Sequence, residues 1–225
     1  MTAIFITATG TDIGKTFIAA GLLQHWYAAG LQPEALKPVA TGFDPATAAT
    51  SDPGVLLSAL GRPVTTAEID RVAPWRFRAP LSPDMAAAQE NRAINFVELL
   101  AFSGRALAEA KGPLLIEGIG GVMVPLDDSH TVLDWIEALN IPVLLVAGSY
   151  LGSLSHTLTS LNALAHRRLV VKALIINETA GSTVPLADTA ATLGRFAGST
   201  SIVTLPRSAA ARAAHTAFAR IAALL

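Results

Sequence analysis

Short runs of aliphatic and β-branched residues alternate with longer helical stretches along nearly the whole chain. The runs predict strands, most of them bounded by Gly, Pro or Asn, at 3–7, 35–39, 114–117, 142–147, 170–177 and 201–205. The stretches between them predict helices at 15–29, 53–60, 94–111, 131–139, 153–167, 185–196 and 208–225. Alternating strands and helices form a parallel sheet that is covered on both faces. We therefore expect a three-layer, doubly wound α/β fold with a mainly parallel sheet.

The length of 225 residues suits one large domain and leaves little room for a second. Hydrophobic residues make up 52% of the chain and charged residues 15%, which excludes a disordered chain. We therefore expect a single domain over 1–225. Residues 41–83 are the richest in Pro, Gly, Asp and Thr, so this region is expected to hold irregular loops around the short helix at 53–60. Long excursions of this kind often carry function.

The chain carries 16 basic and 17 acidic residues, mixed along its length. Such a chain presents no sustained field to nucleic acid or to an anionic membrane, so neither partner is expected. It holds no cysteine, which excludes disulfides, zinc-thiolate sites, iron-sulfur clusters and thiol nucleophiles. The first residues do not resemble a signal peptide, and the apolar runs are far shorter than the ~20 residues of a membrane-spanning helix. We expect a cytoplasmic protein.

The segment ITATGTDIGKT, at 6–16, joins the first predicted strand to the first predicted helix. In this context backbone N–H groups and the helix N-terminus point at phosphate oxygens, while Lys15 approaches the β- and γ-phosphates and the Thr16 hydroxyl binds magnesium. The usual pattern G-x4-G-K-[ST] is not met, because Thr9 occupies the position of its first glycine. A bare Gly-Lys-Thr can also be an ordinary helix start, but the strand-loop-helix context favours a phosphate-binding loop.

The segment GPLLIEGIGG, at 112–121, places a carboxylate at the end of a buried strand. Ligands of open α/β sheets bind at the carboxyl ends of the strands. Glu117 is therefore predicted to be a magnesium ligand or a water-orienting group, like the acidic residue after the second hydrophobic strand of phosphate-binding-loop enzymes. The alternative is a carboxylate that caps the next turn.

The segment ALKPVATG, at 35–42, places Lys37 at the end of the second predicted strand. An ammonium at this edge can bind phosphate or carboxylate anions. The alternative is a surface lysine whose stem lies along apolar residues. The functional interpretation gains weight if Lys37 shares one sheet edge with Lys15 and Glu117.

These segments belong to a series of blocks that resembles the dethiobiotin synthetase family over nearly the whole chain. The blocks are T-G-T-x-T-x-x-G-K-T at 7–16, K-P-V-x-[ST]-G at 37–42, Ser-Asp at 51–52, A-P-x-S-P at 79–83, E-G-x-G-G at 117–121 and L-G-x-x-[NS]-H at 151–156. The first block departs from the family at Ala8, where glycine is expected, and alanine resists positive φ and close ligand approach. Together and in this order, the blocks are specific to the family.

The resemblance implies a P-loop NTPase type of fold and a ligase of biotin biosynthesis that depends on ATP and Mg²⁺. Such an enzyme closes the cyclic ureido ring of dethiobiotin on 7,8-diaminopelargonate (7,8-diaminononanoate), using CO2 and ATP. The reaction passes through a carbamate and a carbamic-phosphoric mixed anhydride, so it needs no protein nucleophile, in agreement with the missing cysteine. The resemblance also implies a homodimer.

The same resemblance implies three groups of site residues. The nucleotide would be bound by Asp12, Ile13, Gly14, Lys15, Thr16, Phe17, Asp52, Glu117, Gly118, Gly120, Asn177, Leu205, Pro206 and Arg207, with Mg²⁺ held by Thr16, Asp52 and Glu117. The diamine would be bound by Lys37, Thr41, Gly152, Ser153, Leu154 and Ser155, the last four of which would receive its carboxylate tail across the dimer interface. Catalysis would depend on Lys37, Lys15 and Thr11. Ser153 is also predicted, from the sequence alone, to be an N-cap with free backbone N–H groups behind it.

The competing prediction is a Walker-type ATPase switch of the partition and cell-division class. Those proteins carry a lysine at the start of the loop, in K-G-G-x-G-K-T, where this chain has Gly10. A C-terminal amphipathic membrane helix rich in Lys or Arg, which would suit such a switch, is not visible in the sequence. Both observations favour the synthetase.

Overall fold

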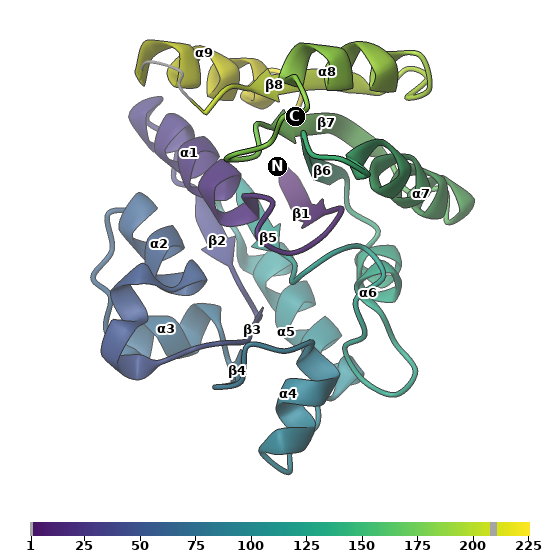
Figure 1. Cartoon of the computed structure of the whole chain (residues 1–225). Coiled ribbons are helices and arrows are strands. Elements are labelled where there is room, and N and C mark those ends of the chain that lie inside the picture. Colours follow the sequence, from purple (N-terminus) through teal and green to yellow (C-terminus); the bar gives the residue numbers. More distant parts are fainter. Residues whose placement is uncertain (1, 208–210) are drawn as a thin grey trace.

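The computed structural model describes residues 2–207 and 211–225. Over these residues six strands form one sheet in the order β2-β5-β1-β6-β7-β8 (Figure 1). Their bounds are Ala3–Ala8 for β1, Glu34–Leu36 for β2, Leu114–Glu117 for β5, Val143–Gly148 for β6, Val171–Asn177 for β7 and Ser201–Leu205 for β8. Each strand runs parallel to the neighbours with which it pairs. The predicted parallel sheet is confirmed.

Helices cover both faces of this sheet. One face carries α1 (Lys15–Ala28) and α9 (Ala211–Ala222), and the other carries α5 (Phe96–Glu109), α6 (Val132–Leu139), α7 (Ser153–His166) and α8 (Leu186–Gly194) (Figure 1). Successive side chains of β1 alternate between the two layers. Ile4 and Ile6 belong to the core under α1 and α9, whereas Phe5 belongs to the core under α5 and α6. The predicted three-layer fold is confirmed.

The contact between α1 and α9 depends on a residue without a side chain. Gly21 of α1 faces the Phe218 ring of α9, and a Cβ atom added at Gly21 would lie 2.1 Å from that ring. Phe17, one turn earlier on α1, meets the same ring edge-on with 6.1 Å between the centroids. The two helices therefore approach so closely that a larger residue at position 21 would force a shift.

The ends of α6 follow from the capping chemistry of its sequence. The Thr131 hydroxyl accepts the N–H of Asp134 at 3.4 Å, and the Asp134 carboxylate accepts the N–H of Thr131 at 2.8 Å. The helix ends at Asn140, which adopts a left-handed conformation with φ 49. The helix predicted at 131–139 is therefore confirmed to within one residue.

The second predicted strand, at 35–39, is wrong in its extent. β2 stops before Lys37, and the next residues form β3 (Val39–Ala40), which pairs with β4 (Trp75–Arg76) in a separate two-stranded sheet. Pro38 has no backbone N–H with which to continue the ladder of the large sheet. Lys37 therefore lies at a break between two sheets, immediately after the carboxyl end of β2.

The region 41–83 is more regular than the sequence predicts. It holds the 3-10 segment η1 (Pro45–Thr50), the helices α2 (Asp52–Ala59) and α3 (Thr66–Val72) and strand β4, and α4 (Pro83–Gln89) follows it. The sequence predicts only α2. The sequence carries a signal for α3, because Thr65 and Glu68 have the spacing of a capping box. In the structure the Thr65 hydroxyl accepts the N–H of Glu68 at 3.3 Å.

The last predicted helix, at 208–225, corresponds to α9, and its predicted first residue, Ser208, lies outside the described residues. α9 packs beside α1 and closes the same face of the sheet (Figure 1). None of the helices in the described ranges is both long and apolar enough to cross a membrane.

Candidate active site

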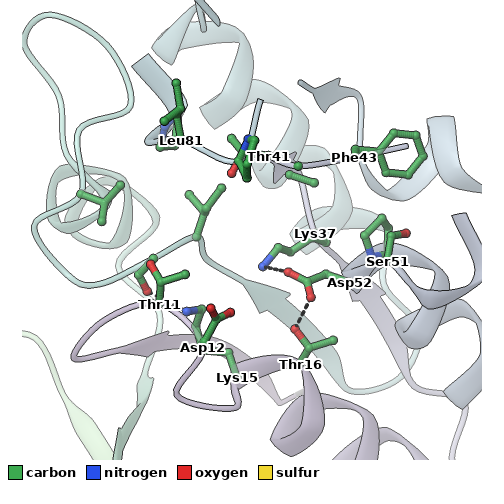
Figure 2. A pocket seen from close by; sticks show the side chains of 18 of the residues that line it. Thr11, Asp12, Lys15, Thr16, Lys37, Thr41, Phe43, Ser51, Asp52 and Leu81 are labelled. Carbon is green, nitrogen blue, oxygen red and sulfur yellow. Dashed lines mark hydrogen bonds and ion pairs between the residues drawn. The ribbon is translucent and has the colours of Figure 1, made fainter. Parts of the chain in front are cut away.

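A cavity of about 750 Å³ opens where the carboxyl ends of β2, β5 and β1 lie side by side (Figure 2). β1 leads into the predicted phosphate-binding loop, β5 ends at Glu117, and β2 ends just before Lys37. Adjacent parallel strands bring these three segments to one edge, where ligands of open α/β sheets bind. The cavity is therefore the candidate active site.

The loop between β1 and α1 owes its shape to two residues with positive φ. Asp12 has φ 56 and Gly14 has φ 103. Gly14 also faces Asn177, whose Nδ2 atom donates to the carbonyl of Ile13 at 2.9 Å, so a Cβ atom on Gly14 would lie 2.3 Å from that amide nitrogen. Ala8, the departure from the family block, lies in β1 without positive φ, and its side chain is buried. Alanine is therefore tolerated at this position.

Lys15 lies in the first turn of α1 with 7% of its surface exposed. Its ammonium donates to the carbonyl oxygens of Gly120 at 2.8 Å and Gly10 at 3.2 Å. Burial, together with the positive charge of Lys37, lowers the pKa of Lys15 from 10.5 to about 8. A bound anion would stabilise the ammonium more than these two neutral carbonyls do.

Lys37 is almost completely buried, with 1% of its surface exposed. Its Nζ atom lies 2.7 Å from Glu117 Oε1, 2.8 Å from Asp52 Oδ2 and 2.9 Å from Gly118 O. Figure 2 shows the side chain directed at Asp52. Burial acts to lower the pKa of Lys37, but the charges of Glu117 and Asp52 outweigh it and hold the pKa above its ordinary value. The alternative of a surface lysine is therefore wrong.

The hydroxyl of Thr16 joins the same cluster. Its Oγ1 atom lies 2.8 Å from Asp52 Oδ1 (Figure 2). It also lies 2.7 Å from Glu117 Oε1. A threonine hydroxyl carries one proton, so it donates to only one of these carboxylates at a time. The Lys37 ammonium, which contacts both carboxylates, offsets the second close approach between oxygen atoms.

These oxygen atoms fit a magnesium site, because Mg²⁺ prefers hard oxygen ligands. Glu117 is fully buried, and its Oε2 atom has no hydrogen-bond partner among the described residues, while Oε1 contacts Lys37 and Thr16. Glu117 therefore does not cap the next turn, and that alternative is wrong.

Burial acts to raise the pKa of Asp52, but the Lys37 ammonium outweighs it and lowers the pKa, so Asp52 stays ionised. Within the described residues no three His, Cys, Asp or Glu side chains could hold a metal together, so the candidate site includes the Thr16 hydroxyl.

Nine of the predicted site residues line this cavity. Those in its lining are Thr11, Asp12, Gly14, Lys15, Thr16, Lys37, Thr41, Asp52 and Gly120. Gly118 contributes its carbonyl to Lys37, and Ile13 belongs to the loop. The side chain of Phe17 is 55% exposed and packs against Phe218 of α9. The expected meeting of Lys15, Lys37 and Glu117 at one sheet edge is confirmed as geometry.

A second group of predicted residues lies at the carboxyl ends of β7 and β8, across β1 from β5 in the sheet order. Asn177 closes β7 and contacts the loop through Ile13. Leu205 closes β8 with 2% of its surface exposed, and Pro206 follows it. Arg207 donates its backbone N–H to the carboxylate of Glu178 at 2.7 Å. Asn177 therefore borders the loop on the side away from Lys37, and Leu205 pairs with Asn177 in the sheet.

The predicted tail-binding turn, Gly152 to Ser155, does not line the cavity of the single chain. Its N-cap is Gly152, with φ 95, and Ser153 is the first residue of α7, so the predicted N-cap role of Ser153 is wrong. Only glycine adopts such a φ without strain, which moves the cap by one residue. Ser153 is fully buried and its hydroxyl has no hydrogen-bond partner in the described part of the chain, while Leu151 before the turn is 91% exposed.

The wall of the cavity that faces the loop contains the predicted Thr41 together with residues 80–83, which had no predicted role. Figure 2 shows Thr41 and Leu81 across the cavity from Asp12 and Lys15. The block A-P-x-S-P at 79–83 is the sequence signal for this wall. The Gly42 N–H donates to the carbonyl of Ala79 at 3.0 Å and thereby fixes this block beside the end of β3.

The fold and the site together define a nucleotide-binding protein of the P-loop class. A family described as an AAA domain matches residues 2–214. ATP-dependent dethiobiotin synthetases are similar over most of their length: that of Acidiphilium cryptum is 50% identical over 89% of this chain and 90% of the relative, and that of Methylobacterium nodulans is 43% identical over 88% and 90%. That of Caulobacter vibrioides is 43% identical over 92% and 94%. The chain belongs to the dethiobiotin synthetase family.

Solved structures of cell-division ATPases share the fold. MinD of Pyrococcus furiosus superimposes with a TM-score of 0.61 and 16% identity, covering 100% of this chain and 98% of its own. MinD of Aquifex aeolicus gives a TM-score of 0.54 with 12% identity, covering 97% and 87%. Identities this low show a common fold and do not support the ATPase-switch alternative.

Proposed function

We propose that this chain closes the cyclic ureido ring of dethiobiotin on 7,8-diaminopelargonate, using CO2 and ATP, and that the cavity at the ends of β1, β2 and β5 is where it does so. One observation carries the assignment of the site. Two ammonium groups, one hydroxyl and two carboxylates from four separate segments converge around this cavity. The competing ATPase switch needs the phosphate-binding loop but gives no role to a buried Lys37.

The phosphates of ATP would lie against the loop and the start of α1. The backbone N–H groups of 12–17 and the positive end of the helix suit an anion there. Lys15 would exchange its two carbonyl partners for the β- and γ-phosphates. Asn177, Leu205, Pro206 and Arg207 would bind the adenine, since Asn177 borders the loop on the side away from Lys37 and Leu205 pairs with it in the sheet.

Magnesium would be held by Thr16, Asp52 and Glu117. The bound ion supplies positive charge to the phosphoryl group that is transferred. The unpartnered Glu117 Oε2 atom and the close contacts of the Thr16 hydroxyl support this set of ligands.

The diamine would bind between Lys37, Thr41 and Thr11. One amine takes up CO2 as a carbamate, and a carbamate oxygen attacks the γ-phosphorus of ATP, which releases ADP and forms the mixed anhydride. The second amine attacks the carbonyl carbon of this anhydride, closes the ring and expels phosphate. All new bonds form between substrates, so the protein supplies position and charge. Lys15 and Lys37 are the cations that would stabilise the transferring phosphoryl group.

The carboxylate tail of the diamine would bind at a second copy of the chain. The turn Gly152 to Ser155 lies at a helix N-terminus, which suits an anion, although the Ser153 N–H already donates to the Tyr150 carbonyl at 2.9 Å. The turn lies off the cavity of its own chain, beside the exposed Leu151. A homodimer would bring this turn to the partner's cavity.

The single domain over 1–225, the cytoplasmic location and the absence of nucleic-acid and membrane partners also stay predictions.

The test mixes purified protein with ATP, Mg²⁺, bicarbonate and diaminopelargonate, and follows phosphate release and the dethiobiotin product by mass spectrometry. Phosphate release that requires the diamine supports the synthetase. Release without the diamine, or release stimulated by DNA or lipid, supports the switch instead. Lys15→Ala and Lys37→Ala should each abolish turnover with an unchanged circular dichroism spectrum, whereas Lys111→Ala, an exposed control, should not. Near-normal activity in either site variant would contradict the assigned roles.

A further inference from the structure

The ammonium of Lys37 is fully engaged within the protein. A lysine ammonium has three N–H donors. Those of Lys37 meet Glu117 Oε1 at 2.7 Å, Asp52 Oδ2 at 2.8 Å and Gly118 O at 2.9 Å. No donor is left for a substrate in this arrangement. Any contact between Lys37 and a substrate therefore requires one of the three to break.

Two of these three partners are the carboxylates that would bind the metal. Glu117 Oε1 accepts Lys37 and also lies 2.7 Å from the Thr16 hydroxyl. Asp52 divides its two oxygens in the same way, with Oδ2 on Lys37 and Oδ1 at 2.8 Å from Thr16. A metal ion among these oxygens and an ammonium on the same two carboxylates would repel each other. The two cations therefore compete for one site.

We propose that Lys37 is a tethered cation that holds the metal ligands together until the metal displaces it toward the substrates. The proposal rests on the proposed function, because it takes Thr16, Asp52 and Glu117 as the metal ligands. Its consequence is an order of events. Lys37 becomes available to the carbamate and the γ-phosphate only after the metal and its nucleotide have entered, so the diamine is not engaged before ATP can react.

The neighbouring groups suit this exchange. The carbonyl of Gly118 gives Lys37 one contact for which the metal does not compete, so the displaced ammonium keeps an anchor. Lys15 is not a second competitor: its ammonium donates to the carbonyls of Gly10 and Gly120, and within the described ranges it forms no ion pair with a carboxylate. Of the two site lysines, only Lys37 therefore contacts the carboxylates that would bind the metal.

The test measures metal affinity in the absence of nucleotide. Mn²⁺ is titrated into the wild-type protein, Lys37→Met and Lys111→Met, and the free ion is followed by electron paramagnetic resonance. Lys37→Met removes the competing ammonium and keeps the apolar stem, whereas Lys111→Met makes the same change at an exposed lysine remote from the site. Loss of a competitor with two charged hydrogen bonds should tighten Mn²⁺ binding about tenfold or more in Lys37→Met. Lys111→Met should bind like the wild type.

Equal or weaker Mn²⁺ binding by a folded Lys37→Met protein would overturn the proposal. Lys37→Gln, which can still donate to Gly118, replaces it if circular dichroism shows that the methionine variant is unfolded. A third measurement needs no variant: a wild-type structure with Mn²⁺ should show the Lys37 ammonium beyond hydrogen-bond distance of Asp52, and an unchanged contact with the metal in place would also overturn the proposal.

The failure of this inference can be distinguished from the failure of the proposed function. Asp52→Asn should weaken Mn²⁺ binding in the presence of ATP if Asp52 is a ligand at all. Normal Mn²⁺ binding by that variant would remove the metal assignment and the tethered-cation proposal together. Weakened binding by Asp52→Asn, combined with no gain in Lys37→Met, would leave the metal site standing and reject only the role of Lys37.

Discussion

The Thr16 hydroxyl lies 2.7 Å from Glu117 Oε1, although 101 positions separate the two residues in the chain. Strand pairing explains this approach. β1 and β5 are parallel neighbours in which Ile6 pairs with Glu117, so the end of β5 lies beside the start of the loop that carries Thr16 into α1. The contact therefore follows from the sheet, and the proposed metal ligands depend on a strand pairing between distant parts of the chain.

Glu117→Gln should lower turnover about 100-fold or more, because it removes a charge that the metal and Lys37 both need. The amide keeps the shape of the side chain, so the fold should survive with a lower free energy of unfolding. Steady-state kinetics over a range of Mg²⁺ concentrations test the loss of turnover. The Mg²⁺ concentration needed for half-maximal rate should be higher for Glu117→Gln than for the wild type. Glu109→Gln, the same change at an exposed residue of α5, is the control. An unchanged Mg²⁺ requirement in Glu117→Gln would remove Glu117 from the metal site.

The pH dependence of ATP binding should follow the pKa of Lys15. Burial and the charge of Lys37 lower this pKa to about 8, so the nucleotide-free protein loses the Lys15 proton above that pH. Phosphates favour the ammonium, so ATP affinity should fall above about pH 8, approaching tenfold per pH unit, and binding should take up a proton there. Calorimetry in buffers with different ionisation enthalpies measures this uptake, and Lys15→Met should abolish it. No proton uptake by the wild type at pH 9 would contradict the assignment.

The same group contributes to stability with a defined sign. The pKa of Lys15 falls from 10.5 to about 8 on folding, so between these values the unfolded chain binds more protons than the folded one. Stability contributed by Lys15 should therefore rise with pH from about 8 to 10.5. The free energy of unfolding of the wild type and of Lys15→Met is measured with denaturant over this pH range, and the difference between the two proteins gives the contribution of Lys15. A difference that does not change with pH would contradict the prediction.

The parts of the site that local sequence could predict are those set by strand ends. Glu117 ends a strand, and Lys15 and Thr16 begin the helix that follows the first strand, and both positions are visible in the hydrophobic pattern. Asp52 is different: it begins α2, and its approach to Lys37 comes from tertiary packing, so only the family resemblance pointed to it. The sequence predicts the correct sheet edge for Lys37, although the predicted strand at 35–39 extends too far.

The errors in the fold have local physical causes. The strand at 35–39 was extended through Pro38, whose missing N–H ends the pairing of β2. The helix α3 was overlooked because the Pro- and Gly-rich surroundings hid the capping pair of Thr65 and Glu68. The residue type of Ser153 predicts an N-cap, whereas the N-cap in the structure is Gly152, which has positive φ. In each case backbone conformation or hydrogen bonding overrode composition.

Gly21→Ala should destabilise the fold, because the added Cβ atom would lie 2.1 Å from the Phe218 ring. Overpacking of this kind costs about 1–3 kcal/mol. Gly104→Ala is a matched control within α5, where a Cβ atom would meet nothing within 4 Å. It should stabilise the fold by about 0.5–1 kcal/mol, since alanine favours a helix over glycine. Thermal unfolding compares the two, and Phe218→Leu should restore part of the loss in the Gly21 variant. Equal effects of both glycine substitutions would contradict the close α1–α9 contact.

Gly14→Ala tests whether the loop geometry, rather than the Lys15 and Thr16 side chains alone, creates the nucleotide site. The substitution places a Cβ atom at φ 103 and 2.3 Å from Asn177 Nδ2, so the loop must abandon either its turn or its hydrogen bond to Asn177. The KM for ATP should rise about tenfold or more, since left-handed strain alone costs about 1–2 kcal/mol. Gly30→Ala imposes comparable strain at φ 79 beyond the end of α1, where a Cβ atom would meet nothing within 4 Å. That variant should lose stability and keep its KM for ATP, and an equal rise in both variants would show that global destabilisation, not the loop, governs binding.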